Sequence, residues 1–102
     1  MSSTQPYTNN IVENLLRVYY SLNDYPDETF SDYYLDLLYG LKELQKQNAT
    51  LYFTLVKVFI NSMPIQACAK EENVTPRMIN YRLNDGLELL TNIMNGDILD
   101  ED

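Results

Sequence analysis

The chain has 102 residues, of which 45% are apolar, and it carries a net charge of −8 at neutral pH. This composition predicts one globular domain with a modest core and excludes a disordered chain. The absence of His removes the usual general base and metal ligand, and the single Cys68 excludes an internal disulfide. No segment approaches the roughly 18 apolar residues of a membrane span, and the start of the chain lacks the features of a signal peptide. We therefore expect a cytoplasmic protein with no membrane partner.

Residues 1–8 are polar and predict a flexible N-terminus, after which a first helix is predicted over residues 9–23. Asn9 or Asn10 is expected to cap this helix by accepting a hydrogen bond from a free backbone N–H. Apolar residues then recur at helical spacing, and these are expected to face the core: Ile11, Val12, Leu15, Leu16, Tyr19 and Leu22. The helix should end before Pro26, because proline disfavours helical backbone at the preceding residue.

A second helix is predicted over residues 27–47. Its inward stripe is expected to consist of Phe30, Tyr34, Leu37, Leu38, Leu41 and Leu44. Gly40 lies in the middle of this helix, where it costs about 1 kcal/mol relative to Ala. It therefore either lets a neighbouring helix approach or marks a bend. In the pairs Tyr19-Tyr20 and Tyr33-Tyr34, one ring is expected inside and the other at the surface.

A third helix is predicted over residues 49–61, with Asn48 and Thr50 as the capping residues at its start. The segment LYFTLVKVFI is apolar on nearly all sides, which predicts a central position in the domain. The β-branched residues within 53–60 make a strand the competing prediction for that segment. The capping residues and the motif that follows favour the helix.

Residues 63–90 predict a short helix, a tight turn and a longer helix. Ser62 or Met63 is expected to cap the short helix, with Pro64 at its first position and its end at Glu71 or Glu72. The last helix should begin at Pro76 after a Thr75 cap and end near residue 94, where Asn95-Gly96 is a helix stop. Residues 95–102 are expected to form an acidic tail. The sequence thus predicts an all-α fold, a five-helix bundle forming one domain over residues 9–94 with a C-terminal helix-turn-helix at 63–90.

Each part of a helix-turn-helix has a suitable residue in this segment. Ala69 is small enough to let the second helix cross the first, and Asn73 tolerates a left-handed backbone. Val74 fills the turn with an apolar side chain, and Thr75 caps the second helix. Ile79 and Leu83 are expected to pack that helix on the first, with Ile65 and Cys68 packing from the other side. Cys68 is therefore expected to be a core residue, without the role of a nucleophile.

These residues, followed by the pattern Arg-Leu-Asn-Asp-Gly-Leu-Glu-Leu-Leu at 82–90, resemble region 4 of sigma-70 family sigma factors and related phage transcription regulators. The resemblance covers residues 49–94. It implies a module that reads promoter DNA and also docks on RNA polymerase. Two features depart from the family: Glu72 stands where Leu is usual, and the second helix of the motif carries few basic residues.

The resemblance also implies a DNA-binding surface. It consists of Thr75, Arg77, Met78, Asn80, Tyr81, Arg82 and Asn84. Arg77 would pair with guanine, Asn80 with adenine, and Thr75 or Tyr81 with phosphate. Three alternatives stay open. In the first, the two arginines pair with Glu71, Glu72 or Asp85 and do not contact DNA. In the second, Asn80 is only a solvated polar residue, and in the third, Met78 faces inward, as helical spacing alone predicts.

Two functions follow from this reading. The first is a small transcription regulator that binds DNA, RNA polymerase or both, with dimerisation through the first two predicted helices as one source of added affinity. The second is an acidic protein-interaction module that binds RNA polymerase, a sigma factor or another regulator without reading DNA. The net charge of −8 favours the second, because DNA binders usually neutralise phosphates with Lys and Arg. The sequence contains no nucleophile–base pair, phosphate loop or metal cluster, so we expect no enzymatic activity, cofactor or metal site.

Overall fold

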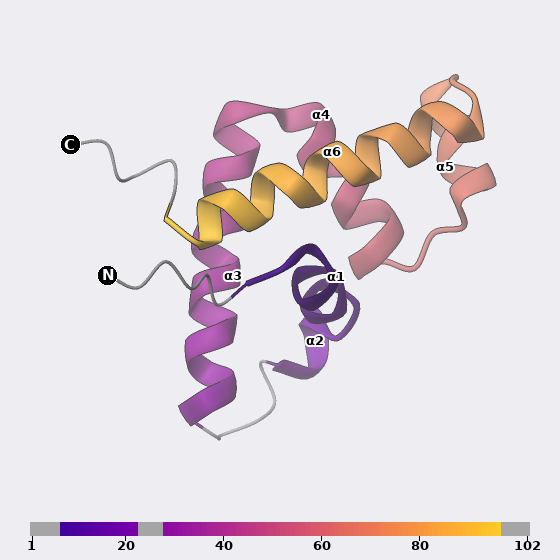
Figure 1. The fold of residues 1–102 in the computed structure, drawn as a ribbon. Coiled ribbons are helices and arrows are strands. Elements are labelled where there is room, and N and C mark those ends of the chain that lie inside the picture. The colour runs from indigo at the N-terminus through magenta and orange to yellow at the C-terminus, as the bar shows by residue number, and fades with distance from the viewer. Residues whose placement is uncertain (1–6, 23–27, 97–102) are drawn as a thin grey trace.

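The computed structural model describes residues 7–22 and 28–96, and every regular element in these two ranges is a helix (Figure 1). The elements are α1 (Asn9–Arg17), α2 (Tyr19–Leu22), α3 (Glu28–Gln47), α4 (Ala49–Leu55), the π-helical turn η1 (Val56–Ile60), α5 (Ile65–Glu72) and α6 (Pro76–Met94). The all-α prediction is confirmed, and the competing strand prediction for residues 53–60 is wrong. None of the helices in the described ranges combines the length and apolarity needed to cross a bilayer.

The first predicted helix, over residues 9–23, is in fact two helices, so the expectation of five helices was too low. Val18 leaves the helical conformation, with φ −105° and ψ 20°, and closes α1 with a hydrogen bond from its N–H to the Asn14 carbonyl. The break redirects the chain so that the Tyr19 ring packs against Tyr34 of α3, with centroids 5.8 Å apart. Residues 23–27, where the Pro26 turn was predicted, lie outside the described residues.

Helix α6 is the centre of the domain and packs on α1, α3, α4 and α5 (Figure 1). The fully buried side chains come from every long helix; the largest are Leu16, Leu37, Leu44, Leu55, Ile79, Leu90 and Ile93. Most predicted inward positions are buried or half-buried. The prediction that Ile11 faces the core is wrong. The face of α1 that packs on the core is narrow and consists of Val12, Leu15 and Leu16, so Ile11 stays exposed. The predicted central helix is also exposed on one side, at Phe53.

Two glycines mark the places where α6 crosses its neighbours closely. A Cβ atom added to Gly40 would lie 2.8 Å from Leu90 Cδ1 and 2.8 Å from Met94 Cγ. One added to Gly86 would lie 3.0 Å from Leu55 Cγ. Both distances are shorter than ordinary carbon–carbon contact. The close-approach prediction for Gly40 is therefore confirmed, and Gly86 does the same on the α4 side.

Tyr7 and Thr8 make specific contacts, which corrects the predicted flexible N-terminus at these two positions; residues 1–6 lie outside the described residues. Tyr7 is buried, its N–H donates to Asn95 Oδ1 at 3.0 Å, and its hydroxyl donates to Asp36 at 2.5 Å. Thr8 is the N-cap of α1, where Asn9 or Asn10 was expected, and its hydroxyl accepts from the Ile11 N–H. Tyr7 thus ties the start of the domain to the end of α6.

The connection from η1 to α5 contains a residue in a strained backbone conformation. Ser62 has φ +61°, in the left-handed region that costs a residue with a Cβ roughly 1–2 kcal/mol. The turn is fixed by the Met63 N–H, which donates to the Lys57 carbonyl at 2.9 Å.

We expect Ser62→Gly to raise the free energy of unfolding by about 0.5–1 kcal/mol, because glycine adopts this conformation without strain. Urea denaturation measures the change. Ser21→Gly is the matched control, since Ser21 lies in α2 and glycine there should lower stability. Equal effects at the two positions would contradict the assignment of strain to Ser62.

Candidate nucleic-acid interface

Helix α5 is anchored to the core by its small residues. Cys68 and Ala69 are fully or almost fully buried, and α5 packs on α6. Burial raises the pKa of the Cys68 thiol, so the thiol stays protonated and has the character of a core side chain. The predicted cap was wrong: Pro64 itself is the N-cap, with an extended backbone (φ −60°, ψ 146°), and α5 begins at Ile65.

The turn between α5 and α6 follows the residue pattern closely. Asn73 adopts the left-handed conformation, with φ 61° and ψ 43°, and its N–H donates to the Lys70 carbonyl. The Val74 N–H donates to the Ala69 carbonyl at 2.9 Å, which completes a Schellman motif. Thr75 then caps α6 by accepting from the Met78 N–H at 3.1 Å. Asn73, Val74 and Thr75 therefore set the direction in which α6 leaves the turn.

The N-terminal half of α6 presents the predicted DNA-binding residues on one open face. Thr75, Arg77, Met78, Asn80, Tyr81 and Asn84 are all exposed, while Ile79 and Leu83 point into the core. Met78 is 44% exposed, so the prediction from helical spacing that it faces inward is wrong. The side chain lies on the open face. Figure 1 shows this end of α6 together with α5, away from α3. The residues that the resemblance pointed to are thus brought together, with the exception of Arg82.

Arg77 lies along the open face and is held there by Tyr81. Its Nε donates to the Tyr81 hydroxyl at 3.1 Å, and its guanidinium carbon lies 5.8 Å from the centre of the Tyr81 ring. No carboxylate of the described residues forms an ion pair with Arg77, so the proposed pairing with a neighbouring acid does not occur among them. Lys70 of α5 is a second exposed cation of this unit.

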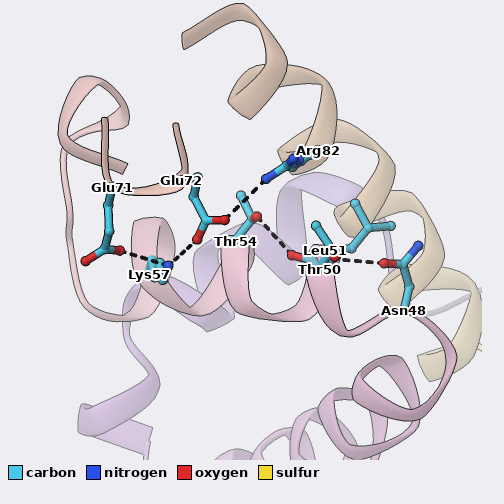
Figure 2. Close-up of polar contacts among 8 residues, drawn as sticks. All are labelled: Asn48, Thr50, Leu51, Thr54, Lys57, Glu71, Glu72 and Arg82. Carbon is cyan, nitrogen blue, oxygen red and sulfur yellow. Dashed lines mark hydrogen bonds and ion pairs between the residues drawn. The ribbon is translucent and has the colours of Figure 1, made fainter. Parts of the chain in front are cut away.

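Arg82 turns away from the open face and joins an ion-pair cluster (Figure 2). Its Nη1 lies 3.6 Å from Glu72 Oε1, and Glu72 also accepts from Lys57, which in turn lies 2.8 Å from Glu71 Oε1. The side chains of Lys57, Glu72 and Arg82 are only 25%, 27% and 22% exposed. Arg82 therefore follows the alternative reading, in which it pairs with Glu72.

This cluster connects α5 and α6 to η1, and the sequence indicated its Arg82–Glu72 pair as an alternative but not the link to Lys57. Lys57 comes from η1, Glu71 and Glu72 from α5, and Arg82 from α6, so the cluster links three elements. The hydrogen bonds that Lys57 donates to Glu71 and Glu72 raise the pKa of Lys57, and the hydrogen bond that Glu72 accepts from Lys57 lowers the pKa of Glu72. The signal for that link was Glu72, a charged residue at the end of the first helix of the predicted motif. A carboxylate that is partly buried at this position requires a partner of opposite charge.

We expect acid to weaken this link. Because the pKa of folded Glu72 is lowered, its contribution to stability is present at neutral pH and is lost as the pH falls through that lowered pKa. Glu72→Gln removes the charge and should cost between the about 0–1 kcal/mol of an exposed pair and the about 3–5 kcal/mol of a broken buried pair.

Urea denaturation of wild type and Glu72→Gln at pH 7 and at roughly pH 3 tests this expectation. The stability gap between the two proteins should shrink at the lower pH. Glu88→Gln, at an exposed site on α6, is the matched control and should show a small gap at both values. A gap for Glu72→Gln that does not change with pH would contradict the assignment.

The described residues contain no group of three or more His, Cys, Asp or Glu side chains placed to hold a metal ion, and no pocket indents their surface. Comparison of the chain with protein-family models, with curated proteins and with solved structures finds no match in any of the three.

Proposed function

We propose that this protein is a small transcription regulator whose α5–turn–α6 unit is a helix-turn-helix that reads DNA, in the manner of sigma region 4. The observation that carries the proposal is the open face at the N-terminal half of α6, where six polar, aromatic or thioether side chains are exposed together. In helix-turn-helix proteins the N-terminal residues of the second helix contact base edges. The Thr75 cap and the left-handed Asn73 support the same assignment.

The residues of the open face have the chemistry that base reading requires. Arg77 can donate two hydrogen bonds to the O6 and N7 atoms of guanine, and Asn80 can form a bidentate pair with adenine. The Tyr81 hydroxyl holds the Arg77 side chain along the helix, which reduces the entropy lost when it binds. Thr75 and Tyr81 would contact phosphates and position α6 in the groove.

The charge of the unit limits its affinity. Residues 63–90 contain three cations and four carboxylates, and Arg82 is occupied by Glu72, so Arg77 and Lys70 are the exposed cations of the unit. Phosphate neutralisation supplies much of the affinity for DNA. Tight binding therefore requires a second contribution, either from RNA polymerase or from a second copy of the chain.

The same charge balance supports a second candidate, a protein-interaction module that docks on RNA polymerase or another transcription protein without reading DNA. Here the α5–α6 unit presents Met78 and Tyr81 as apolar contacts, which are the residue types enriched at protein interfaces. The specific observation behind it is that Glu72 withdraws Arg82 from the open face.

Selection of DNA sequences from a randomised pool, at low salt and with RNA polymerase omitted or added, separates the two candidates. The DNA-reading function predicts enrichment of a short sequence, with affinity that falls as salt rises. No enrichment in either condition, together with capture of RNA polymerase by the protein, would replace it with the interaction module. Enrichment only with polymerase present would show that the affinity comes from the joint complex.

A further inference from the structure

Helix α3 carries a row of exposed side chains on the side away from the core, here called the α3 stripe. Its members are Asp32, Leu35, Tyr39, Lys42 and Lys46, separated by three, four, three and four residues. All five are exposed, whereas Leu37, Leu41 and Leu44 on the opposite side are buried. Alternating spacings of three and four residues place side chains along one seam of a helix, as in helix–helix pairs.

The centre of the α3 stripe is apolar. Leu35 is 58% exposed and Tyr39 is 41% exposed, although neighbouring positions of the same helix supply the core. Exposed apolar side chains flanked by charges are typical of a surface that another helix covers. No helix of the described part of the chain covers this face.

The exposed charges of α3 in the described residues have opposite signs on the two sides of Tyr39, and Glu43, whose side chain is only 22% exposed, is the one carboxylate on the lysine side. Asp32 lies seven residues before Tyr39 and Lys46 seven residues after it. Asp36 lies three residues before it and Lys42 three residues after it. Two antiparallel copies of α3 related by a two-fold axis at Tyr39 would place Asp32 and Asp36 at the level of Lys46 and Lys42 of the other copy. A two-fold interface requires this kind of self-complementary surface.

We propose that the α3 stripe is an antiparallel homodimer interface, with Tyr39 on the two-fold axis and Asp32 opposite Lys46 of the second copy. Self-complementarity favours a second copy over an unrelated partner, because the carboxylates before Tyr39 and the lysines after it then both meet charges of opposite sign. Lys46 can reach across, since its side chain is 64% exposed and its own-chain partner Glu43 lies at 3.4 Å. The pairing leaves the open face of α6 uncovered, because α5 and the start of α6 lie away from α3 (Figure 1). The proposal does not depend on DNA binding.

Charge reversal tests the proposed register. Asp32→Lys would place Lys opposite Lys46, and Lys46→Glu would place Glu opposite Asp32, so each single variant repels its own copy twice. The double variant D32K/K46E restores opposite charges at both places, and so does an equal mixture of the two single variants. Asp36 stays unchanged in all of them, because it accepts the Tyr7 hydroxyl hydrogen bond.

Sedimentation equilibrium at low salt gives the dimer dissociation constant for each protein. We expect a dimer for the wild type, a dissociation constant raised about tenfold or more in each single variant, and recovery in the double variant and in the mixture. Lys70→Glu is the matched control, an exposed lysine on α5, and should leave the constant unchanged.

A second measurement detects the two-fold axis directly. Tyr39→Cys should form an intermolecular disulfide under mild oxidation, whereas Lys70→Cys should not, and native Cys68 does not compete because it is fully buried. A wild-type chain that stays monomeric at high concentration would overturn the proposal. Failure of D32K/K46E to recover dimerisation would overturn it as well, because the antiparallel register requires that recovery.

Discussion

Replacing Arg77 with Ala is expected to remove most of the sequence-specific DNA binding and to leave the fold intact. A bidentate contact between Arg and guanine contributes about 1–3 kcal/mol of discrimination, which corresponds to a loss of roughly 5–150-fold. Arg77 is exposed and forms no ion pair with the described carboxylates, so its removal leaves no buried charge without a partner. Titration of the selected DNA site by fluorescence anisotropy measures the loss.

The kind of loss tells which DNA group Arg77 contacts. A base contact predicts that discrimination at one position of the site relaxes while the slope of affinity against salt stays the same. A phosphate contact would weaken all sequences alike and reduce that slope by about 1. Lys70→Ala should give this second pattern, because Lys70 is an exposed cation on α5 at the edge of the unit.

Arg17→Ala is the matched control for Arg77→Ala. Arg17 is also an exposed arginine, but it lies on α1 and pairs with Glu13 at 2.7 Å. Its removal changes the net charge by the same amount and should leave DNA affinity almost unchanged at moderate salt. Equal losses in the two variants would mean that only total charge matters and would contradict base reading by α6.

The α5–α6 turn could be predicted residue by residue because its causes are local. A left-handed Asn73, an apolar Val74 and a Thr75 cap each act on backbone groups a few residues away. The open face follows from the same turn, since Ile79 and Leu83 fix which side of α6 faces the core. Local rules of this kind need no knowledge of the remaining chain.

The parts that could not be predicted depend on residues far apart in the chain. Tyr7 is ordered because it bonds with Asn95, 88 positions later, and no local pattern indicates such a pair. Arg82 was placed on the DNA surface, yet Glu72 holds it, and Glu72 is itself held by Lys57 from η1. Predicting this cluster requires knowing how three elements pack together. The number of charges in the sequence therefore could not show that Arg77 is exposed on the open face whereas Arg82 pairs with Glu72.

Leu90→Ala should be among the most destabilising single changes, lowering the free energy of unfolding by about 2–5 kcal/mol. Leu90 is fully buried where α6 crosses α3, and the total stability of a small domain is only about 5–15 kcal/mol. Urea denaturation at concentrations where the chain is monomeric measures the loss. Leu35→Ala is the matched control, because Leu35 is exposed on the outer side of α3 and its truncation should have little effect.

Combining Leu90→Ala with Gly40→Ala tests whether the close crossing of α3 and α6 limits the core. In the wild type, alanine at position 40 gains about 1 kcal/mol of helix propensity but meets two atoms at 2.8 Å, an overpacking cost of about 1–3 kcal/mol. Leu90→Ala removes one of these atoms, and the half-buried Met94 side chain that carries the other can rotate away. Gly40→Ala should therefore destabilise the wild type and stabilise the Leu90→Ala protein. The same sign in both backgrounds would mean that the two helices do not constrain each other at this crossing.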